Sequence, residues 1–282
     1  MGPVAPGMIE QLPVSRTLVA IATYNERKTL PPLVEVIRHI LPPIRILVID
    51  DASPDGTGEW CRERQKTDPE FFLIERSGKL GLGTALTTAM EYAVDHGYRY
   101  LITMDADHSH PVALLPRLLA VAEGQDPDAQ VPRSVPLESC PDIVIGSRYC
   151  RGGSISGWPL RRYLMSGAIN LYSRLVLRLP VRDCSGGYRC YRVDRLRPAL
   201  SRPLLSQGYS FEEEILWRLR CGGAKMTEIP IHFVNRLHGS SKLRIRGILT
   251  AIRVLLRLTF AQWFLGGFRP VESKDGERFS CR

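Results

Sequence analysis

Short apolar runs alternate with stretches of helical periodicity through the first half of the chain. The runs have the length of buried strands and cover Thr17–Ala22, Ile44–Ile49, Phe71–Glu75, Tyr100–Met104 and Ile143–Ile145. Between the runs, apolar residues recur at helical spacing over Lys28–Ile40, and we expect further helices over Gly58–Lys66, Thr84–His96 and Pro111–Ala122. Strands that alternate with helices predict right-handed βαβ units, and therefore an α/β fold with a mostly parallel sheet.

The second half of the chain is less regular. We expect helices over Leu160–Leu179 and Glu212–Arg220, and a strand over Lys225–Val234. The segment Arg246–Phe264 is amphipathic, with large apolar residues on one side and Arg253 on the other. Such a helix either lies in a membrane interface or packs its apolar side on its own domain, and the pattern leaves both open.

Composition changes this picture little. The chain has 282 residues, of which 44% are hydrophobic and 24% charged, as in a globular protein with a sizeable core. We expect a loose Pro/Gly-rich arm over residues 1–14, a folded domain over 15–245, the amphipathic helix over 246–268 and a disordered tail over 269–282. The Pro-rich stretch Gly124–Pro141 is predicted to be a surface insertion.

Charge is distributed unevenly along the chain. Residues 1–147 carry 13 Lys and Arg against 20 Asp and Glu, whereas residues 148–282 carry 25 against 9. The strongly basic second half indicates an anionic partner, which is a phosphate, a nucleic acid or a membrane surface. The longest uncharged stretch near the C-terminus, Leu258–Phe268, is too short for a membrane span of about 20 residues.

The seven cysteines form no CxxC pair, and residues 1–12 lack the basic start and apolar run of a signal peptide. We therefore expect reduced thiols and a cytosolic protein.

Polar clusters follow three of the predicted strands. In an open α/β sheet, ligands bind beyond the carboxyl ends of the strands, so these clusters are the first candidates for a site. Asp105 and Asp107 end one strand, and carboxylates on alternate residues can converge on a hard divalent ion such as Mg²⁺. The alternative is that Asp107 or Ser109 caps the helix that begins near Pro111.

The other clusters carry weaker signals. One of the adjacent acids Asp50 and Asp51 can accept hydrogen bonds from a base or ribose, or else form the turn that ends at Gly56. The stretch Lys79–Gly83 (KLGLG) can line a phosphate site in front of a helix.

Other polar residues are open to a structural role. His108 and His110 are expected to be structural, because the carboxylates beside them are better ligands for a hard ion. The acids Glu212, Glu213 and Glu214 have a ready alternative explanation as favourable charge at a helix N-terminus.

At this point the motifs match a known pattern. The chain resembles glycosyltransferase family 2, and within it the dolichol-phosphate (polyprenol-phosphate) mannose synthases, over about residues 16–245. The matching stretches, in order, are ATYNE, VIDDASPDGT, RSGKLGLGTA, MDADHSHP, IGSRY, DCSGGYRCYR, GYSFEEE and EIPIHFVNRLHGSSKL.

The resemblance implies a nucleotide-sugar-binding GT-A fold and transfer of mannose from GDP-mannose to a polyprenyl phosphate, with Mg²⁺ or Mn²⁺. It implies that Asp105 and Asp107 engage the metal and the diphosphate. The implied donor side comprises Ala22, Tyr24, Glu26, Asp50, Asp51 and Lys79. Phosphate contacts are implied for Arg148, Arg162, Arg236 and Lys242, with Arg148 and Arg236 counted as catalytic.

Three positions depart from the family pattern. Ser109 stands where some members carry Gln at the metal, and Glu212 replaces the Gln of an FQxE motif. Gly167 stands where many members have Arg, so that one contact to the acceptor phosphate is in doubt unless Arg161 or Arg162 compensates.

The implied acceptor is a lipid monophosphate, which is largely a dianion at pH 7 and needs no general base. Direct displacement would then invert the donor linkage and give a β-mannosyl phosphate. We expect peripheral attachment to the cytoplasmic face of a membrane through the amphipathic helix, with room for a membrane-anchoring subunit.

Two other functions remain open. One is a family member that uses UDP-glucose or a related donor. The other is a non-catalytic module that binds anions or nucleic acid, although no nucleic-acid-binding motif is present and acidic strand ends would repel such a partner; we expect none.

Overall fold

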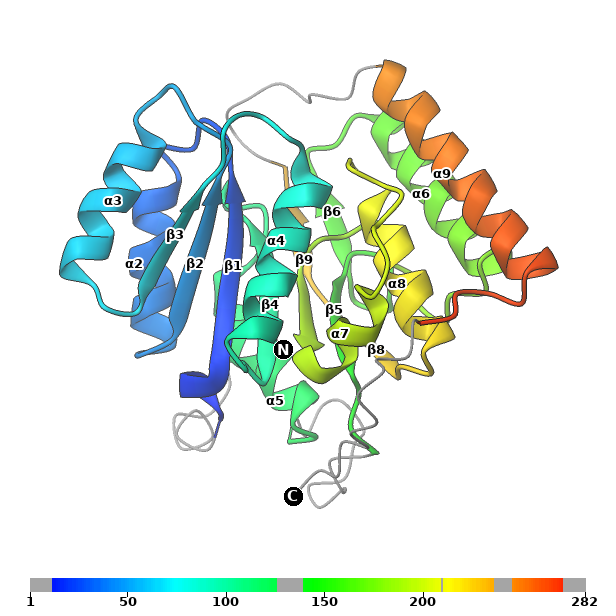
Figure 1. Ribbon diagram of the computed structural model, residues 1–282, viewed down its shortest axis with the longest axis horizontal. Coiled ribbons are helices and arrows are strands. Elements are labelled where there is room, and N and C mark those ends of the chain that lie inside the picture. The colour runs from blue at the N-terminus through cyan, green and yellow to red at the C-terminus, as the bar shows by residue number, and fades with distance from the viewer. Residues whose placement is uncertain (1–11, 126–138, 209, 236–244, 271–282) are drawn as a thin grey trace.

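A seven-stranded sheet with helices on both faces forms the protein (Figure 1). The structure, a computed structural model, describes residues 12–125, 139–208, 210–235 and 245–270. The strands, in spatial order, are β3 (Phe71–Glu75), β2 (Arg45–Asp50), β1 (Thr17–Thr23), β4 (Tyr100–Asp105), β7 (Arg189–Arg192), β5 (Ile143–Ser147) and β8 (Met226–Pro230). Neighbours pair in parallel except β7, which is antiparallel to both β4 and β5. The prediction of a mostly parallel α/β sheet is confirmed.

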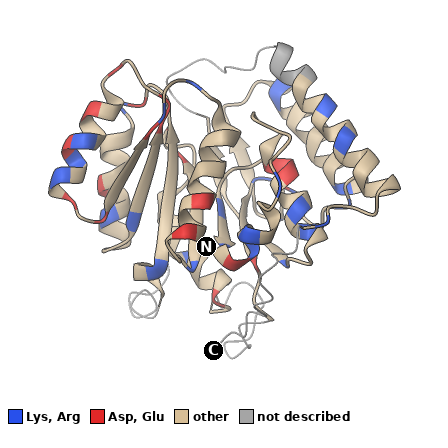
Figure 2. Ribbon diagram, in the orientation of Figure 1, with Lys and Arg blue, Asp and Glu red and all other residues tan. Residues whose placement is uncertain are grey.

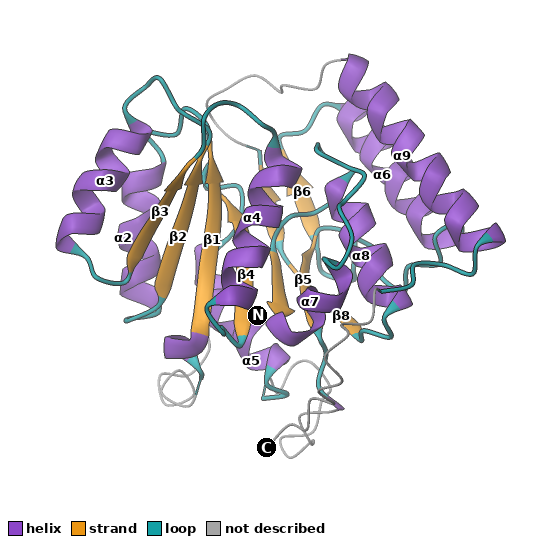
Figure 3. Cartoon of the chain, viewed as in Figure 1, coloured by secondary structure: helices purple, strands orange, loops and turns teal. Residues whose placement is uncertain are grey.

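The helices cover the sheet in two layers (Figure 3). They are α2 (Leu30–Ile40), α3 (Thr57–Thr67), α4 (Leu82–Asp95), α5 (Leu115–Ala122), α6 (Leu160–Leu175), α7 (Leu196–Ala199), α8 (Phe211–Cys221) and α9 (Ile245–Phe264). Three 3₁₀ turns are described as well, η1 (Val14–Arg16), η2 (Val112–Leu114) and η5 (Val193–Arg195).

Side chains of the central strand β1 alternate between the two faces of the sheet, and the hydrophobic core lies in two parts, one on each face. Val19 and Ile21 of β1 face the layer that contains α2, α3 and α5, whereas Leu18 and Ala20 face α4, α7, α8 and α9. Successive side chains of a strand point to opposite faces, so a strand that is apolar at both faces needs cover on both. The continuous apolar runs of the sequence reflect this arrangement.

Helix α2 begins and ends where its prolines allow. The sequence pattern placed its start at Lys28, whereas the helix begins at Leu30, with Pro31 in its first turn. Proline is tolerated there because the first amides of a helix have no intrahelical acceptor. Pro42 and Pro43 follow two residues beyond the end.

Two expectations about the elements were wrong, and two short strands were not expected. The predicted strand Lys225–Val234 is two strands, β8 in the main sheet and β9 (His232–Val234), which pairs in parallel with β6 (Ser154–Ser156) in a second sheet. Neither β6 nor β7 was predicted, because both are short and polar in sequence. The helix predicted to Leu179 ends at Leu175, before Arg178 adopts a left-handed φ of 56°.

The boundary of the folded domain also lies earlier than expected. Leu12 and Val14, placed in a loose arm, are each 7% exposed and belong to the core. Most of that arm, most of the Gly124–Pro141 insertion and residues 271–282 of the tail lie outside the described residues.

Helices α6 and α9 lie side by side at one edge of the molecule (Figure 1). The Tyr172 hydroxyl lies 2.5 Å from the Thr259 hydroxyl, and the Trp263 indole donates to the Val176 carbonyl at 3.0 Å. Val254, Leu255 and Leu258 bury one stripe of α9 against the core. Among the described residues, every helix is too short or too polar to cross a bilayer.

Candidate functional site

The three polar clusters meet at one edge of the sheet, as the sequence predicted. In the register of the parallel strands, Ala22 of β1 pairs with Asp105 of β4, and Thr23 pairs with Asp50 of β2. Parallel neighbours end at the same edge, so the loops after these strands surround one surface. Those loops carry most of the described residues predicted to bind the donor or a metal.

Asp105 presents its carboxylate at this edge. The side chain is 44% exposed, while the backbone amide of the same residue donates to Nδ1 of His110 at 3.0 Å. Since Nδ1 is an acceptor, the neutral ring carries its proton on Nε2, which lies 3.7 Å from a carboxylate oxygen of Asp105. Burial lowers the pKa of His110, and its ring stacks on Tyr188. The structural role expected for His110 is therefore observed.

Asp107 holds the turn that follows β4. Its carboxylate accepts from the Ser109 amide at 3.0 Å, whereas the 3₁₀ turn η2 begins after Pro111 without a side-chain cap. The capping alternative for Asp107 and Ser109 is thus not what the structure shows. His108, at a left-handed φ of 60°, lies with Nε2 3.0 Å from the Thr29 carbonyl and attaches this turn to the start of α2.

Asp50 and Asp51 are both buried but have different partners. Asp50 accepts from the hydroxyls of Thr23 at 2.8 Å and Ser53 at 2.6 Å and from the Ser53 amide at 2.9 Å. Its carboxylate is therefore engaged by the turn, the alternative that the sequence had left open. Asp51 is paired with Arg76 and also accepts from the amide of Gly81 at 3.3 Å.

The Asp51–Arg76 pair positions the glycine-containing loop before α4. Arg76 reaches onward to the Thr84 hydroxyl at 2.6 Å, so one ion pair connects two strand ends to this helix. Gly81 has a φ of 102°, and a Cβ there would lie 2.6 Å from the Gln207 carbonyl oxygen. Only glycine fits this position without a shift of backbone. Arg76 was not singled out from the sequence, since a lone arginine after a strand carries no signal.

Tyr24, Glu26 and Lys79 come together around the same edge. The Lys79 ammonium lies 4.0 Å from the centre of the Tyr24 ring, a cation–π contact between two of the loops. The Glu26 carboxylate accepts from the Thr29 hydroxyl at 2.8 Å, and the Glu26 amide donates to the Thr57 hydroxyl at 3.0 Å. The loops after β1 and β2 are therefore joined by direct hydrogen bonds.

A second group of residues lies beyond β5. The buried Arg148 guanidinium binds both oxygens of Asp183, at 2.8 and 2.7 Å, and the Ser185 hydroxyl at 2.9 Å. Burial opposes charge on both partners, yet each stabilises the other, so that the pKa of Asp183 is lowered and that of Arg148 is raised. The Arg148 guanidinium is therefore held in an ion pair with Asp183, a partner that was not predicted from the sequence.

Arg162 lies close to this pair. Its guanidinium donates to the Asn235 side-chain oxygen at 3.0 Å and lies 4.1 Å from the centre of the Trp158 ring, which Arg148 approaches at 5.2 Å. The two other predicted phosphate-binding residues, Arg236 and Lys242, lie outside the described residues.

The three glutamates at the start of α8 are all buried. Glu212 pairs with the fully buried Arg189 at 2.7 Å, and Glu214 pairs with Arg218 at 2.7 Å. Burial raises the pKa of Glu212 to about 7 and that of Glu213 to about 8. Their place in the first helical turn is as expected, but two of them have arginine partners that the sequence did not predict.

No group of three or more His, Cys, Asp or Glu side chains in the described part of the chain is arranged to hold a metal. Asp105 and Asp107 supply two carboxylates, so a hard divalent ion here would take further oxygen ligands from a substrate or water. Mg²⁺ is commonly held in that way, by one or two carboxylates and substrate phosphates.

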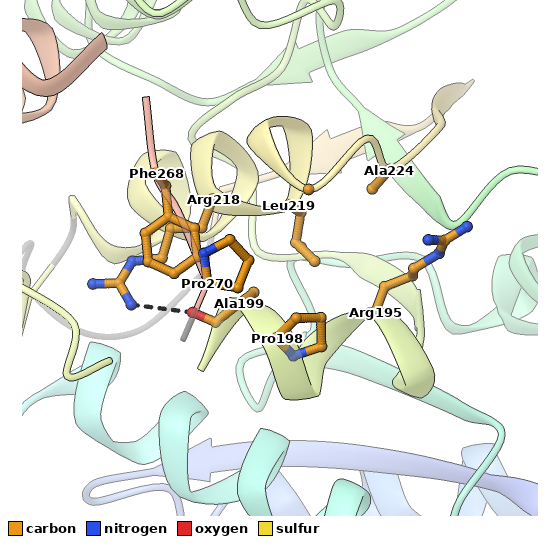
Figure 4. Close-up of a pocket in the computed structure, with 9 residues that line it drawn as sticks. Arg195, Pro198, Ala199, Arg218, Leu219, Ala224, Phe268 and Pro270 are labelled. Carbon is orange, nitrogen blue, oxygen red and sulfur yellow. Dashed lines mark hydrogen bonds between the residues drawn. The ribbon is translucent and has the colours of Figure 1, made fainter. Parts of the chain in front are cut away.

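A small, partly open space away from the strand ends does not belong to this site. It measures about 30 Å³ and is lined by residues of η5, α7, α8 and the segments after α8 and α9, among them Arg195, Arg218 and Phe268 (Figure 4). Arg218 donates there to the Ala199 carbonyl at 3.1 Å. Such a volume holds one or two water molecules and no nucleotide sugar.

A mostly parallel sheet with acidic residues at its strand ends is the arrangement of a sugar-nucleotide transferase. Residues 18–197 match the model of glycosyl transferase family 2, and the chain belongs to this family. Two relatives narrow the class. A polyprenol monophosphomannose synthase of Mycolicibacterium smegmatis is 38% identical over 90% of this chain and 89% of its own length. An undecaprenyl-phosphate mannosyltransferase of Micrococcus luteus is 39% identical over 81% of this chain and 87% of its own length.

Solved structures share the fold. Glucosyl-3-phosphoglycerate synthase from Mycobacterium tuberculosis, in complex with Mn²⁺, UDP and phosphoglyceric acid, superposes with a TM-score of 0.61 at 19% identity, covering 91% of this chain and 83% of that one. A mannosyltransferase from Pyrobaculum calidifontis, in complex with GDP-Man and Mn²⁺, gives a TM-score of 0.53 at 18% identity, covering 90% and 66%. These likenesses confirm the GT-A-type fold.

Proposed function

We propose that this protein transfers mannose from GDP-mannose to a polyprenyl phosphate and yields a polyprenyl β-mannosyl phosphate. The observation that carries the proposal is the meeting of Ala22, Asp50 and Asp105 at one sheet edge in a chain 38% identical to a polyprenol monophosphomannose synthase. The names of both relatives, a polyprenol monophosphomannose synthase and an undecaprenyl-phosphate mannosyltransferase, join mannose with a polyprenyl carrier.

Asp105 and Asp107 would hold Mg²⁺ or Mn²⁺ together with the donor diphosphate. Their fit rests on two carboxylates placed on alternate residues, of which Asp105 is 44% exposed. The bound ion would neutralise charge on the departing GDP. Asp107 contributes a second role, because its bond to the Ser109 amide fixes the turn that presents both carboxylates.

The nucleotide would lie over Ala22, Tyr24 and Glu26, with Lys79 beside it. The contact of Lys79 with the Tyr24 ring supports this arrangement, because it brings a cation and an aromatic face together where a nucleotide presents phosphates and a base. Asp50 and Asp51 support these loops through the hydrogen bonds described above rather than through free oxygens.

The acceptor phosphate would be met by Arg162, Arg236 and Lys242. Arg148 serves as a positioning residue, since its guanidinium is held by Asp183 and shares the Trp158 ring with Arg162. A lipid monophosphate is already mostly a dianion at pH 7, so the acceptor oxygen attacks without a general base. Positioning and electrostatics then supply the catalysis, and displacement inverts the anomeric carbon.

Helices α6 and α9 would place the enzyme on the cytoplasmic face of a membrane. Beside its buried stripe, α9 leaves a second apolar stripe outside, in which Leu256 is 58%, Phe260 55% and Phe264 74% exposed. The described part of α9 carries arginines and no acidic residue (Figure 2). Positive charge of this kind favours contact with anionic headgroups. The buried stripe of α9 packs on the domain, and we assign the outer stripe to the membrane interface. A membrane-anchoring subunit remains compatible with this attachment.

The donor is tested by turnover. The full chain is mixed with Mn²⁺ and vesicles that contain undecaprenyl phosphate, and GDP-mannose is compared with UDP-glucose by mass spectrometry of the lipid product. We expect mannosyl product from GDP-mannose and a β linkage by NMR. Glucosyl product alone would replace the donor in this proposal with UDP-glucose, and an α linkage would contradict direct displacement.

A further inference from the structure

His110 faces Asp105 with both nitrogens of its ring. Nδ1 accepts from the Asp105 backbone amide at 3.0 Å, and Nε2 lies 3.7 Å from a carboxylate oxygen of the same residue. The bond from the amide requires a lone pair on Nδ1, so the ring proton is on Nε2, the nitrogen nearer the carboxylate. One neutral imidazole therefore offers an acceptor to the backbone of Asp105 and a donor toward its side chain.

Two aromatic side chains from other parts of the chain hold this ring in place. It stacks on Tyr188 with the ring centres 4.9 Å apart, and it meets Phe233 of β9 at 5.7 Å with an angle of 68° between the planes. Tyr188 is itself buried, and its hydroxyl donates to the Pro111 carbonyl at 3.1 Å. Since His110 is only 3% exposed, the imidazole has little room to turn away from Asp105.

The Asp105 carboxylate has more room than the ring that faces it. Its side chain is 44% exposed, and 3.7 Å is too long for a hydrogen bond from Nε2. Because the ring is packed and the carboxylate is not, a rotation of the Asp105 side chain is the motion that can close this gap. A bond from Nε2 would then fix one carboxylate oxygen and leave the other for an incoming ion.

The other histidine of this turn has a different neighbour. Nε2 of His108 lies 3.0 Å from the Thr29 carbonyl, at the start of α2. Within the described part of the turn, the histidine next to the Asp105 carboxylate is therefore His110.

We infer that His110 is a positioning residue that orients the Asp105 carboxylate for a divalent ion. The inference rests on the proposed function, in which Asp105 and Asp107 hold Mg²⁺ or Mn²⁺. Nε2–H donates to one oxygen of Asp105 while the other oxygen binds the ion. Carboxylates that bind metals are commonly hydrogen-bonded by an outer group, and loss of that group typically weakens metal binding about 10–100-fold.

Two substitutions separate this role from a purely structural one. His110→Asn keeps a side-chain oxygen that can accept from the Asp105 amide, as Nδ1 does, but places no group at the position of Nε2. His110→Gln is longer, and its amide can donate to the carboxylate from the position of Nε2. A structural role depends on the Nδ1 bond, whereas the positioning role depends on the Nε2 proton.

Mn²⁺ binding to the full chain in the presence of GDP is measured by electron paramagnetic resonance of the free ion, which requires no turnover. We expect the Kd for Mn²⁺ to rise about tenfold or more in His110→Asn and to stay within about threefold of wild type in His110→Gln. The control is Tyr188→Phe, which loses the bond to Pro111 beneath the same ring and should bind Mn²⁺ as the wild type does.

Thermal melts without metal identify any variant that does not fold. If His110→Asn is such a variant, His110→Gln decides alone, and a tenfold loss of Mn²⁺ affinity in it would overturn the positioning role. Wild-type affinity in His110→Asn, or a loss in Tyr188→Phe as large as in His110→Asn, would also overturn it and leave the metal site in place. If the wild type itself binds no Mn²⁺, the metal is removed from the proposed function, and this inference fails with it.

Discussion

Three carboxylates at the ends of neighbouring strands have different neighbours and therefore different tasks. Asp50 is saturated by hydroxyl and amide donors, and Asp51 is paired with Arg76, so both stabilise loops. Asp105 remains 44% exposed at the same edge. A carboxylate oxygen that is already bound by the protein is a poorer ligand for an incoming ion, so the exposed Asp105 is the first candidate for the metal site proposed above, with Asp107 in the same turn as the second.

Asp107→Asn tests that assignment. Loss of the charge should lower the rate of mannosyl transfer about 100-fold or more, because an electrostatic contact to the leaving group is removed. Asp95→Asn, an exposed acid at the end of α4, is the control and should retain wild-type turnover. The measurement is the initial rate of mannosyl transfer with GDP-mannose and Mn²⁺. A wild-type rate in Asp107→Asn would refute the metal role.

Glu213 gives a pH-dependent prediction. Burial raises its pKa from 4.5 to about 8, so the folded protein keeps a proton that the unfolded chain releases at lower pH. This contribution to stability is present below pH 4.5 and is lost as pH rises through about 8. Relative to wild type, Glu213→Gln should therefore raise the melting temperature by several degrees at pH 9 and by little at pH 5.

Thermal melts at the two pH values check this expectation, with Glu91→Gln on the exposed side of α4 as the control. If Glu213→Gln has the same melting temperature as the wild type at pH 9, the pKa of Glu213 is not raised by burial.

At the scale of elements, α9 shows how one helix serves two surfaces. Its hydrophobic residues are too many for one contact: Val254, Leu255 and Leu258 pack on the core, while Leu256, Phe260 and Phe264 stay outside. A periodic apolar pattern reports the sum of both stripes, so the sequence could not separate them.

The double variant F260A/F264A tests the outer stripe. We expect binding to anionic vesicles to weaken about tenfold or more, because two exposed aromatic side chains are lost from the interface. The melting temperature should hardly change, since the rings are 55% and 74% exposed. The control is the double variant V36A/L205A, which removes two exposed apolar side chains elsewhere on the surface and should bind vesicles as the wild type does in a sedimentation assay. Equal vesicle binding by the two double variants would contradict the role of α9.

At the scale of the whole molecule, one buried ion pair connects the end of β5 to the segment before β7. Asp183 is fully buried and Arg148 nearly so, and this contact fixes the region where Trp158 and Arg162 lie. Removal of one partner of a buried pair leaves an uncompensated charge, which costs about 3–5 kcal/mol. Asp183→Asn should lower the free energy of unfolding by about this amount.

Denaturant titration measures that loss. Asp194→Asn removes an acid whose side chain is 53% exposed and pairs with Arg192 at the surface, so it should cost at most about 1 kcal/mol. Similar losses in the two variants would mean that the Arg148–Asp183 pair is not the strong contact its burial indicates.

By itself the sequence determined the α/β class, most strand and helix positions, and the edge at which the site lies. It could do so because buried parallel strands and amphipathic helices have distinct local patterns, and because parallel strands all end on one side. The acids after Ala22, Ile49 and Met104 were therefore brought together by topology alone.

Only the tertiary structure decided which polar residues remain available. The partners Arg76 of Asp51, Asp183 of Arg148 and Arg189 of Glu212 lie 23 or more residues away along the chain. The strand β7 lies between β4 and β5 inside the sheet, although its sequence, RCYR, is short and contains two arginines. One of them, Arg189, is fully buried. Local patterns report the burial of apolar faces, whereas the pairing of charges depends on which distant segments the fold brings within hydrogen-bonding distance.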